Sequence, residues 1–362
     1  MKRILLSSAC IVGFAGAAAA DGHASVSFGG DAELGYNDDF NNGMFWSFGL
    51  SVSGSAELDN GLTATISGDI DIDDDDATFA SRNVEISDLV IGLSSDTASL
   101  TFGDTAPAAD ALYSSAVKNM DADGFAEQGG PEDGVLIGRM SFGEAEVGVS
   151  YFVIDSNGAP NDDLLGLQVG ANATFGTVDL TFGYQDSDVA GGEIVAFGAS
   201  TTLGGATVGL GYASADLGID SLGVQAAYTF GQVTGTVFYV AQDGVDDNYG
   251  VAVDYANGPV TLGVLYHDGN VEDLQVNATY DVGNGISLFG GYRDEMDSAA
   301  GVAGSTMFYL GGDYDLGGGA NLRVSYADVN TAAGAVNTLA LDELGAAEDV
   351  KLGTTVAVSF EF

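Results

Sequence analysis

The chain has 362 residues, of which 53 are Asp or Glu and only 8 are Lys or Arg, so its formal net charge is −45. This charge excludes proteins that bind a nucleic-acid backbone, because such binding requires clustered basic side chains. Hydrophobic residues make up 46% of the chain, which excludes an intrinsically disordered acidic protein.

Residues 1–20 have the layout of a secretory signal peptide: a basic start, an apolar stretch over 4–15 and an Ala-x-Ala-like site ending at Ala20. We predict cleavage after Ala20, with residues 21–362 forming the mature protein. Cys10, the only cysteine, would leave with the signal. We disfavour lipidation of Cys10, because the apolar stretch continues beyond it. An exported protein without disulfides needs another source of stability, such as a closed hydrogen-bonded sheet.

After the signal, apolar and polar residues alternate with a period of two. The alternation is clear over 26–36, 46–52, 62–66, 274–282 and 350–362. Successive side chains of a strand point to opposite faces, so each segment predicts a strand with one apolar and one polar face. No apolar stretch of about 18 residues follows the signal, so no membrane-crossing helix is predicted.

Short turns separate the predicted strands and alternate with longer acidic connections. Gly and Asn, which tolerate the positive φ of tight hairpins, occupy these turns. About nine short turns imply nearly twenty strands in an up-and-down meander with no domain boundary. Eight turns are identified at 59–61, 142–144, 175–177, 203–205, 230–232, 257–259, 284–285 and 316–319, and acidic connections at 37–43, 73–76, 155–163, 243–247 and 331–348.

Two architectures fit this alternation. In a soluble β protein the apolar faces meet inside, whereas in a membrane barrel they face lipid and the polar faces line a wet lumen. Three features favour the membrane barrel: the number of strands, a polar face with almost no Lys, and aromatic residues near strand ends. We therefore predict an all-β transmembrane antiparallel barrel of 16 to 20 strands in the outer membrane of a Gram-negative bacterium.

Several short motifs, taken in order, carry a family resemblance. They are the segment 100–104 before a long connection, the Phe-Gly turns, the glycine-rich segment 314–320, and the last strand ending at Phe362. In this the chain resembles the Gram-negative porins, specifically the Rhodobacter-type porins of alphaproteobacteria. The resemblance implies sixteen strands, a homotrimer, and a role for Phe362 as a signal to the outer-membrane assembly machinery.

The resemblance also implies that the longest connection, 104–134, folds into the barrel and narrows it. Its charged residues would face inward-pointing arginines across the lumen and create a transverse field. The alternative is a solvated loop outside the barrel, with each arginine paired locally. The predicted constriction residues are Asp104, Asp110, Lys118, Asp121, Asp123 and Glu127 of the loop, and Arg139, Arg293 and Arg323 of the wall.

Metal and catalytic sites receive little support. The run 73–76 could bind Ca²⁺ through its carboxylates, but a solvated, self-repelling loop is the favoured interpretation. Weakly bound Ca²⁺ at acidic loops, bridging to lipopolysaccharide, is the one metal role kept open. His23 and His267 are isolated, and no catalytic constellation is present, so we predict no enzyme and no cofactor.

The predicted function is passive diffusion of small hydrophilic solutes and ions, with a preference for cations because acids dominate the chain. The expected partners are these solutes, outer-membrane lipid and lipopolysaccharide, and further copies of the chain. Three alternatives stay open: a substrate-specific channel, a plugged structural or adhesive barrel, and a soluble secreted β protein.

Overall fold

The computed structural model describes residues 24–40, 43–74, 83–126, 134–154, 160–186, 192–216, 218–269, 272–296, 304–331 and 350–362. These residues form twenty strands, one short α-helix and one turn of 3₁₀ helix. The strands are β1 (Ala24–Asn37), β2 (Met44–Glu57), β3 (Thr63–Asp74), β4 (Asn83–Ser94), β5 (Ala98–Gly103), β6 (Val135–Phe142), β7 (Ala145–Ile154), β8 (Pro160–Phe175), β9 (Val178–Gln185), β10 (Ile194–Leu203), β11 (Ala206–Ala215), β12 (Ile219–Phe230), β13 (Val233–Asp243), β14 (Asn248–Asn257), β15 (Val260–Asp268), β16 (Asp273–Gly283), β17 (Ile286–Glu295), β18 (Ser305–Gly317), β19 (Ala320–Thr331) and β20 (Gly353–Glu361); the helices are α1 (Ala108–Leu112) and η1 (Asp121–Asp123).

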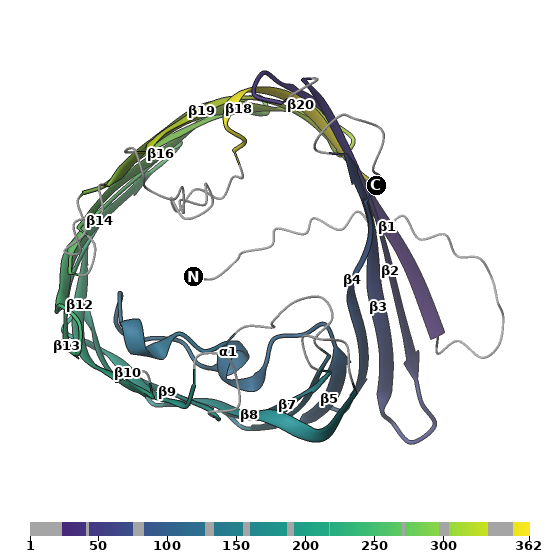
Figure 1. Cartoon of the computed structure of the whole chain (residues 1–362), viewed down its shortest axis with the longest axis vertical. Helices are drawn as coiled ribbons and strands as arrows, with labels where there is room; N and C mark the ends of the chain where they lie inside the picture. The colour runs from purple at the N-terminus through teal and green to yellow at the C-terminus, as the bar shows by residue number, and fades with distance from the viewer. Residues whose placement is uncertain are drawn as a thin grey trace.

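The strands form one closed antiparallel sheet. Each strand pairs with the next one in the chain, and β1 pairs with β20 to close the ring, as Figure 1 shows. At the seam the N–H groups of Gly30 and Phe362 each donate to the carbonyl of the other residue, at 2.8 Å. Phe362 therefore extends the closing strand pair. Closure leaves no free sheet edge along the paired part of the wall, which is the requirement for a sheet in hydrocarbon.

Twenty strands lie at the upper limit of the predicted range and exceed the sixteen that the resemblance implies. All eight turns identified from sequence join consecutive strands. A ninth short turn joins β4 to β5 and lacks glycine. There the Ser95 hydroxyl accepts a hydrogen bond from the Ala98 N–H at 3.1 Å, which replaces the usual glycine-based turn chemistry.

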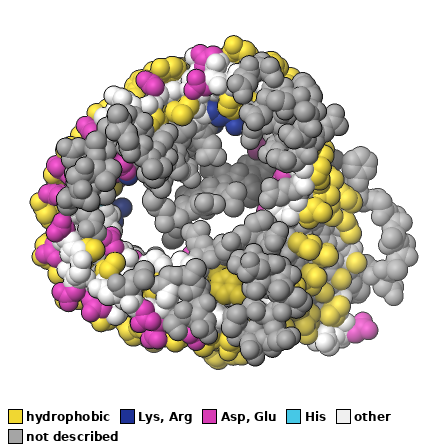
Figure 2. All heavy atoms as spheres, in the orientation of Figure 1, with side chains coloured by type: hydrophobic (Ala, Val, Ile, Leu, Met, Phe, Trp, Pro, Cys, Tyr) yellow, Lys and Arg dark blue, Asp and Glu magenta, His cyan; other side chains and the backbone are white. Residues whose placement is uncertain are grey.

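The apolar face of the strands points outward. On β1, for example, Val26, Phe28 and Leu34 are 53–59% exposed, whereas Asn37, on the opposite face, is fully buried inside. Figure 2 shows hydrophobic side chains along the outside of the ring and Lys or Arg side chains at the edge of the central opening. This arrangement contradicts a soluble β protein, in which the apolar faces would meet in a dry centre.

In the part of the chain that the structure describes, no helix is long and apolar enough to cross a bilayer. The described hydrophobic core lies inside the ring, where segments of chain cover the inner wall. The larger core cluster joins the connection between β5 and β6 to β10–β13, and a smaller one joins Val350 to β17–β19.

Candidate functional site

The chain leaves the wall at Gly103, the last residue of β5. Gly103 has φ +132°, and a Cβ there would overlap the Leu89 carbonyl of β4, so only glycine fits. The next residue, Asp104, forms two hydrogen bonds with β4. It donates its N–H to the Leu89 carbonyl at 3.0 Å, and its carboxylate accepts the Asp88 N–H at 3.0 Å. Asp88 itself has φ +51° at a bulge of β4. These contacts turn the chain into the barrel.

Residues 104–126, which we call the inward loop, then run along the inner wall. The loop begins with α1, which packs against β7, β8 and β9 and lies inside the ring in Figure 1. It continues past β10–β12, which η1 contacts, and reaches β14, whose Asn248 side chain donates to the Asn119 carbonyl at 2.8 Å. The inward course predicted for this connection is thus confirmed over its described residues.

Glycine residues of the wall strands lie beneath the inward loop. A Cβ at Gly170 would overlap the Ala108 carbonyl oxygen, and one at Gly209 would overlap the Ala116 carbonyl oxygen. Two rows of register-paired glycines cross neighbouring strands here, one over β7–β9 and one over β10–β12. The missing side chains let the loop backbone approach the sheet directly; the rows are Gly148, Gly170 and Gly183, and Gly198, Gly211 and Gly223.

Small and apolar side chains fill the space between the inward loop and these strands. Val117, Met120 and Phe125 of the loop are each at most 9% exposed. They pack on Ile194 and Ala196 of β10 and on residues of β11 and β13. Burying such side chains fully stabilises the docked loop by about 1.5–3 kcal/mol each.

Two buried glutamines on neighbouring strands hold both ends of the inward loop. Gln168 of β8 accepts the Ala109 N–H at 3.2 Å and donates to the Ala126 carbonyl at 3.0 Å. Gln185 of β9, opposite Gln168 in the sheet, accepts the Ala126 N–H at 2.7 Å and the Gln168 amide at 3.2 Å. Both side chains are fully buried. This pair, the glutamine clamp, satisfies backbone groups that burial would otherwise leave unpaired.

A second set of polar side chains holds the middle of the inward loop. Gln242 of β13 donates to the Asp121 carboxylate at 3.0 Å and accepts the Asp121 N–H at 3.3 Å. Asn248 donates to the other Asp121 oxygen at 3.1 Å. Further along, Gln225 of β12 accepts the Lys118 N–H at 3.1 Å. Asp121 therefore helps to anchor the loop to the wall.

The inward loop is also bonded to itself. The Tyr113 hydroxyl donates to the Asp123 carboxylate at 3.0 Å, and the Tyr113 and Phe125 rings meet edge to face at 5.2 Å. Burial raises the pKa of the Asp123 carboxyl, against the lowering effect of its hydrogen bonds from Ser115 and Tyr113. Burial and the Asp123 charge also raise the pKa of the Tyr113 hydroxyl, so it stays a donor at neutral pH.

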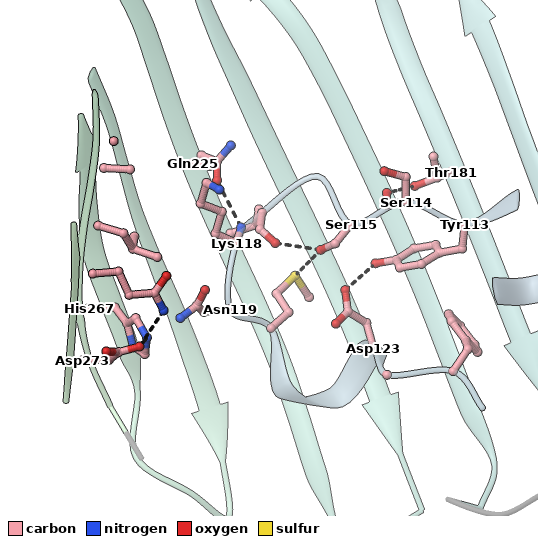
Figure 3. Close-up of a pocket in the computed structure, with 18 of the residues that line it drawn as sticks. Tyr113, Ser114, Ser115, Lys118, Asn119, Asp123, Thr181, Gln225, His267 and Asp273 are labelled. Atoms are coloured by element: carbon pink, nitrogen blue, oxygen red, sulfur yellow. Dashed lines mark hydrogen bonds and ion pairs between the residues drawn. The ribbon is translucent and has the colours of Figure 1, made fainter. Parts of the chain in front are cut away.

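Beside the inward loop lies a cavity of ≈ 1610 Å³, which is lined by the loop and by wall strands that include β14–β17. Figure 3 shows Lys118 and Asn119 on the loop, with His267 and Asp273 on the wall strands. Most of its lining is hydrophilic and comes from the loop on one side and from β14–β17 on the other. The polar lining includes Asp110, Lys118 and Asp123 of the loop and Asp254, His267, Asp273, Gln275, Asn277 and Arg293 of the wall.

A chain of ion pairs lies on the far wall of this cavity. The fully buried Asp273 carboxylate accepts Arg293 Nε at 3.0 Å and Gln275 Nε2 at 2.7 Å. Arg293 Nη2 lies 2.9 Å from Glu295, and His267 Nε2 lies 3.5 Å from Asp273. The positive charge of Arg293 is thus compensated by two carboxylates.

The inner face of β1–β4 is a second charged surface, which we call the acidic wall. These strands contain no Lys or Arg. A Cβ at Gly49 would overlap Asp31 Oδ1 of β1 and lie 3.1 Å from Asp71 Oδ1 of β3, so two carboxylates from different strands meet above this glycine. The Ser87 hydroxyl donates to Asp71 at 3.1 Å. The inward-facing acids on β1 and β3 are Asp31, Glu33, Asp69 and Asp71.

The other basic side chains among the described residues lie outside the cavity lining. Arg139 faces inward, on the same side of β6 as Ile137, and lies 3.9 Å from Glu146. Arg323 pairs with Asp313 through two bonds of 2.9 and 3.1 Å and lies over the Phe289 ring. Lys351 lies over the Phe45 ring at 4.9 Å. The described residues offer the exposed Lys118 ammonium no ion-pair partner, in contrast with Arg139 and Arg323.

The structure brings together four of the nine predicted constriction residues, namely Asp110, Lys118, Asp123 and Arg293, around one cavity. Asp104 and Asp121 instead fix the loop. Arg139 and Arg323 have the predicted inward direction but form local pairs outside this cavity. Glu127 lies outside the described residues, as do Asp75 and Asp76 of the acidic run. No group of three or more His, Cys, Asp or Glu placed to hold a metal ion occurs among the described residues.

Sequence reasoning missed the glutamine clamp and the glycine rows, and it wrongly treated His267 as isolated, since His267 Nε2 lies 3.5 Å from Asp273. In the sequence, the polar faces of these strands do not differ from the polar faces of the other strands. Only the register of neighbouring strands reveals that Gln168 stands opposite Gln185, or that His267 stands opposite Asp273.

The known proteins to which this chain is similar are porins. A family model described as Gram-negative porin matches residues 7–220 and 216–334 of the chain. Among solved structures, a triple mutant of the Rh. blastica porin is 16% identical, with a TM-score of 0.46 and coverage of 94% of this chain and 100% of that one. Another triple mutant, titled Rhodopseudomonas blastica porin, is 17% identical, with a TM-score of 0.43 and the same coverage. None of the curated proteins compared matches the chain.

Proposed function

The chain belongs to the Gram-negative porin family, and we propose that this member is a diffusion pore of the outer membrane that prefers cations. Passive diffusion through an outer-membrane barrel follows from the family and the fold. The preference for cations and the identity of the narrowest point are our proposals.

The observation that carries the proposal is the open, hydrophilic cavity beside a docked inward loop. The glycine rows and the glutamine clamp hold the loop against β7–β14, so it occupies one side of the lumen. A cavity of ≈ 1610 Å³ lies beside the loop. Solutes would pass between the loop and the far wall, and Asp110, Lys118, Asp123 and Arg293 would meet them there.

Two features support the preference for cations. The acidic wall contributes Asp31, Asp69 and Asp71 with no basic residue on its four strands. On the far wall, Arg293 is compensated by Asp273 and Glu295. A lumen of net negative charge concentrates cations and depletes anions within about a Debye length, roughly 10 Å at 0.1 M salt.

Planar-bilayer recording of the purified protein tests both parts of this proposal. Discrete conductance steps are expected for an open pore, and the reversal potential in a KCl gradient should have the sign of potassium permeability. The absence of steps would favour the plugged structural barrel instead. Saturating, solute-specific block would favour a substrate-specific channel. A reversal potential of the opposite sign would overturn the cation preference.

We propose four further properties of the mature protein. Residues 1–20 would be removed on export, Phe362 would be read by the assembly machinery, and the barrel would form a homotrimer. Ca²⁺ would bind weakly at acidic loops next to lipopolysaccharide. Mass spectrometry of the mature N-terminus tests the cleavage, and deletion of Phe362 tests the assembly signal. Light scattering in detergent tests the homotrimer, and calcium titration tests the binding of Ca²⁺.

A further inference from the structure

Residues 350–352, which we call the second inward segment, lie inside the ring just before β20. Figure 1 shows this stretch as the yellow coil inside the ring beside β18. Val350 is only 3% exposed. It packs in a buried cluster whose other members are inner-face residues of β17–β19, namely Phe289, Met307, Tyr309 and Ala327. The segment therefore covers part of the inner wall, as the inward loop does elsewhere in the ring.

The wall under the second inward segment carries aromatic rings that lie over glycines. A Cβ at Gly291 of β17 would overlap the Tyr309 ring, and one at Gly311 of β18 would overlap the Phe289 ring. Each glycine stands opposite the ring-bearing residue in the register of β17 and β18. The rings give Val350 an apolar surface inside the ring, and burial on it favours the docked position because it removes apolar area from water.

A fully buried asparagine holds the other end of the segment. Asn37, the last residue of β1, donates to the Leu352 carbonyl at 2.7 Å and to Thr355 Oγ1 at 2.8 Å. Asp38 adds two bonds to Thr354: its N–H donates to the Thr354 carbonyl at 3.2 Å, and its carboxylate accepts the Thr354 N–H at 2.5 Å. A buried carbonyl is costly without a donor, so Asn37 fixes the position of the segment.

The side chain between these two contacts reaches β2. The Lys351 ammonium lies over the Phe45 ring at 4.9 Å and over the Phe40 ring at 5.9 Å, which are cation–π distances. Phe45 is itself a buried inner-face residue, and its ring occupies the place of a Cβ at Gly35 of β1. Since Val350 contacts β17–β19, the second inward segment spans the inner wall on both sides of β20.

The two covered parts of the inner wall flank the wall of the cavity. The inward loop covers β7–β14, and the second inward segment covers β17–β19 and the strands at the seam. The cavity wall includes β14–β17, which lie between them in the ring. We propose that the second inward segment narrows the lumen from the seam side, and that Asn37 is the positioning residue that holds it there. The inference rests on the proposed function, because a segment limits diffusion only in a barrel that conducts.

Single-channel conductance of the full chain tests this inference. Asn37→Leu removes the donor of the Leu352 carbonyl, and Val350→Asn places an amide in the apolar cluster; neither changes the charge of the lumen. Each should free the segment and raise the conductance by up to about twofold, because transport through a water-filled pore depends on its diameter. Larger neutral polymers should also enter the lumen.

Asn321→Leu is the matched control. It makes the same exchange on the inner face of β19, at the hairpin end of the strand, where Asn321 stands opposite Asp315. Conductance and polymer exclusion should stay as in the natural protein. A merely structural role of Asn37 would lower stability without changing the conductance of the barrels that fold. Unchanged conductance in both Asn37→Leu and Val350→Asn would therefore overturn the inference.

A labelled cysteine keeps the inference testable if these variants do not fold. Cys10 is the only cysteine of the chain and lies in the predicted signal peptide, so Lys351→Cys would provide the only thiol of the mature protein. A bulky uncharged thiol reagent on this cysteine should lower the conductance relative to the unlabelled variant. No change on labelling would overturn the inference. The absence of conductance steps in the natural protein is a separate outcome, which contradicts the pore itself.

Discussion

Two parts of the inner wall share the same strand geometry and differ in what covers them. Under the inward loop, β7–β14 present glycine, small apolar residues and the buried amides of Gln168, Gln185 and Gln242. The acidic wall of β1–β4 presents half-buried and exposed carboxylates instead. The difference shows that strands with the same alternating pattern can serve two roles. One part of the inner wall buries the docked loop, and the other exposes carboxylates to water and ions.

The largest effect is expected when a side chain is added to a wall glycine beneath the inward loop. Gly170→Val places side-chain atoms where the Ala108 carbonyl lies, and overpacking of this kind costs about 1–3 kcal/mol. We expect the inward loop to detach from the wall strands, which should make the single-channel conductance larger and noisier. Gly235→Val on β13 is the matched control, because a Cβ there meets nothing within 4 Å. Equal conductance in both variants would contradict a docked loop.

A smaller effect is expected when the glutamine clamp is broken. Gln168→Leu leaves the Ala109 N–H and the Ala126 carbonyl without their buried partner, at a cost of about 1–3 kcal/mol. Urea unfolding in detergent measures the loss of stability, and current noise measures the freed loop. Because Gln168 and Gln185 bond to each other, the double variant Gln168→Leu/Gln185→Leu should lose less than the sum of the single variants. Strict additivity would show that the two residues act independently.

Neutralising the acidic wall tests the other half of the comparison. Asp31→Asn together with Asp71→Asn should lower the potassium-to-chloride permeability ratio by about twofold or more, because two charges leave the lumen. Conductance steps should persist, since neither residue touches the inward loop. Asp294→Asn removes a carboxylate from the outer face of β17, where it bonds Tyr292, and should leave selectivity unchanged. Equal effects of inner and outer substitutions would mean that lumenal position does not matter.

The smallest effect is expected at Lys118 of the inward loop. Lys118→Gln removes the exposed lumenal ammonium and should strengthen the cation preference by up to about twofold. Its backbone N–H, which bonds Gln225, is retained, so the loop should stay docked. Lys118→Arg keeps the charge and should behave as the natural protein. An unchanged cation preference in Lys118→Gln would place the ion path elsewhere.

Much of the fold could be predicted from sequence, because strand alternation and glycine turns are local signals. The outward apolar face and eight of the nine short turns follow from such patterns, whereas the inward course of the long connection was implied by the family resemblance. The turn at Ser95 was missed because a serine hydroxyl replaces glycine there. The strand count was uncertain because the family expectation of sixteen conflicts with the number of turns.

The site was predicted less completely, because its chemistry depends on register. Alternation gives Arg323 its inward direction but not its partner, Asp313, which lies opposite it on β18. The same holds for Arg293, whose charge is compensated by Asp273 on the neighbouring strand. Counting charges along the chain therefore does not show which of them are free.

The most direct test of the account asks whether the inward loop is docked while the pore conducts. A Cβ at Gly198 of β10 would lie 3.4 Å from the Ala116 Cβ of the loop, close to the spacing of a disulfide. We predict that oxidising the pair Ala116→Cys/Gly198→Cys leaves single-channel conductance and selectivity the same as in the reduced protein. A large change in either quantity when the disulfide forms would contradict the account, because it would show that the working pore keeps the loop elsewhere.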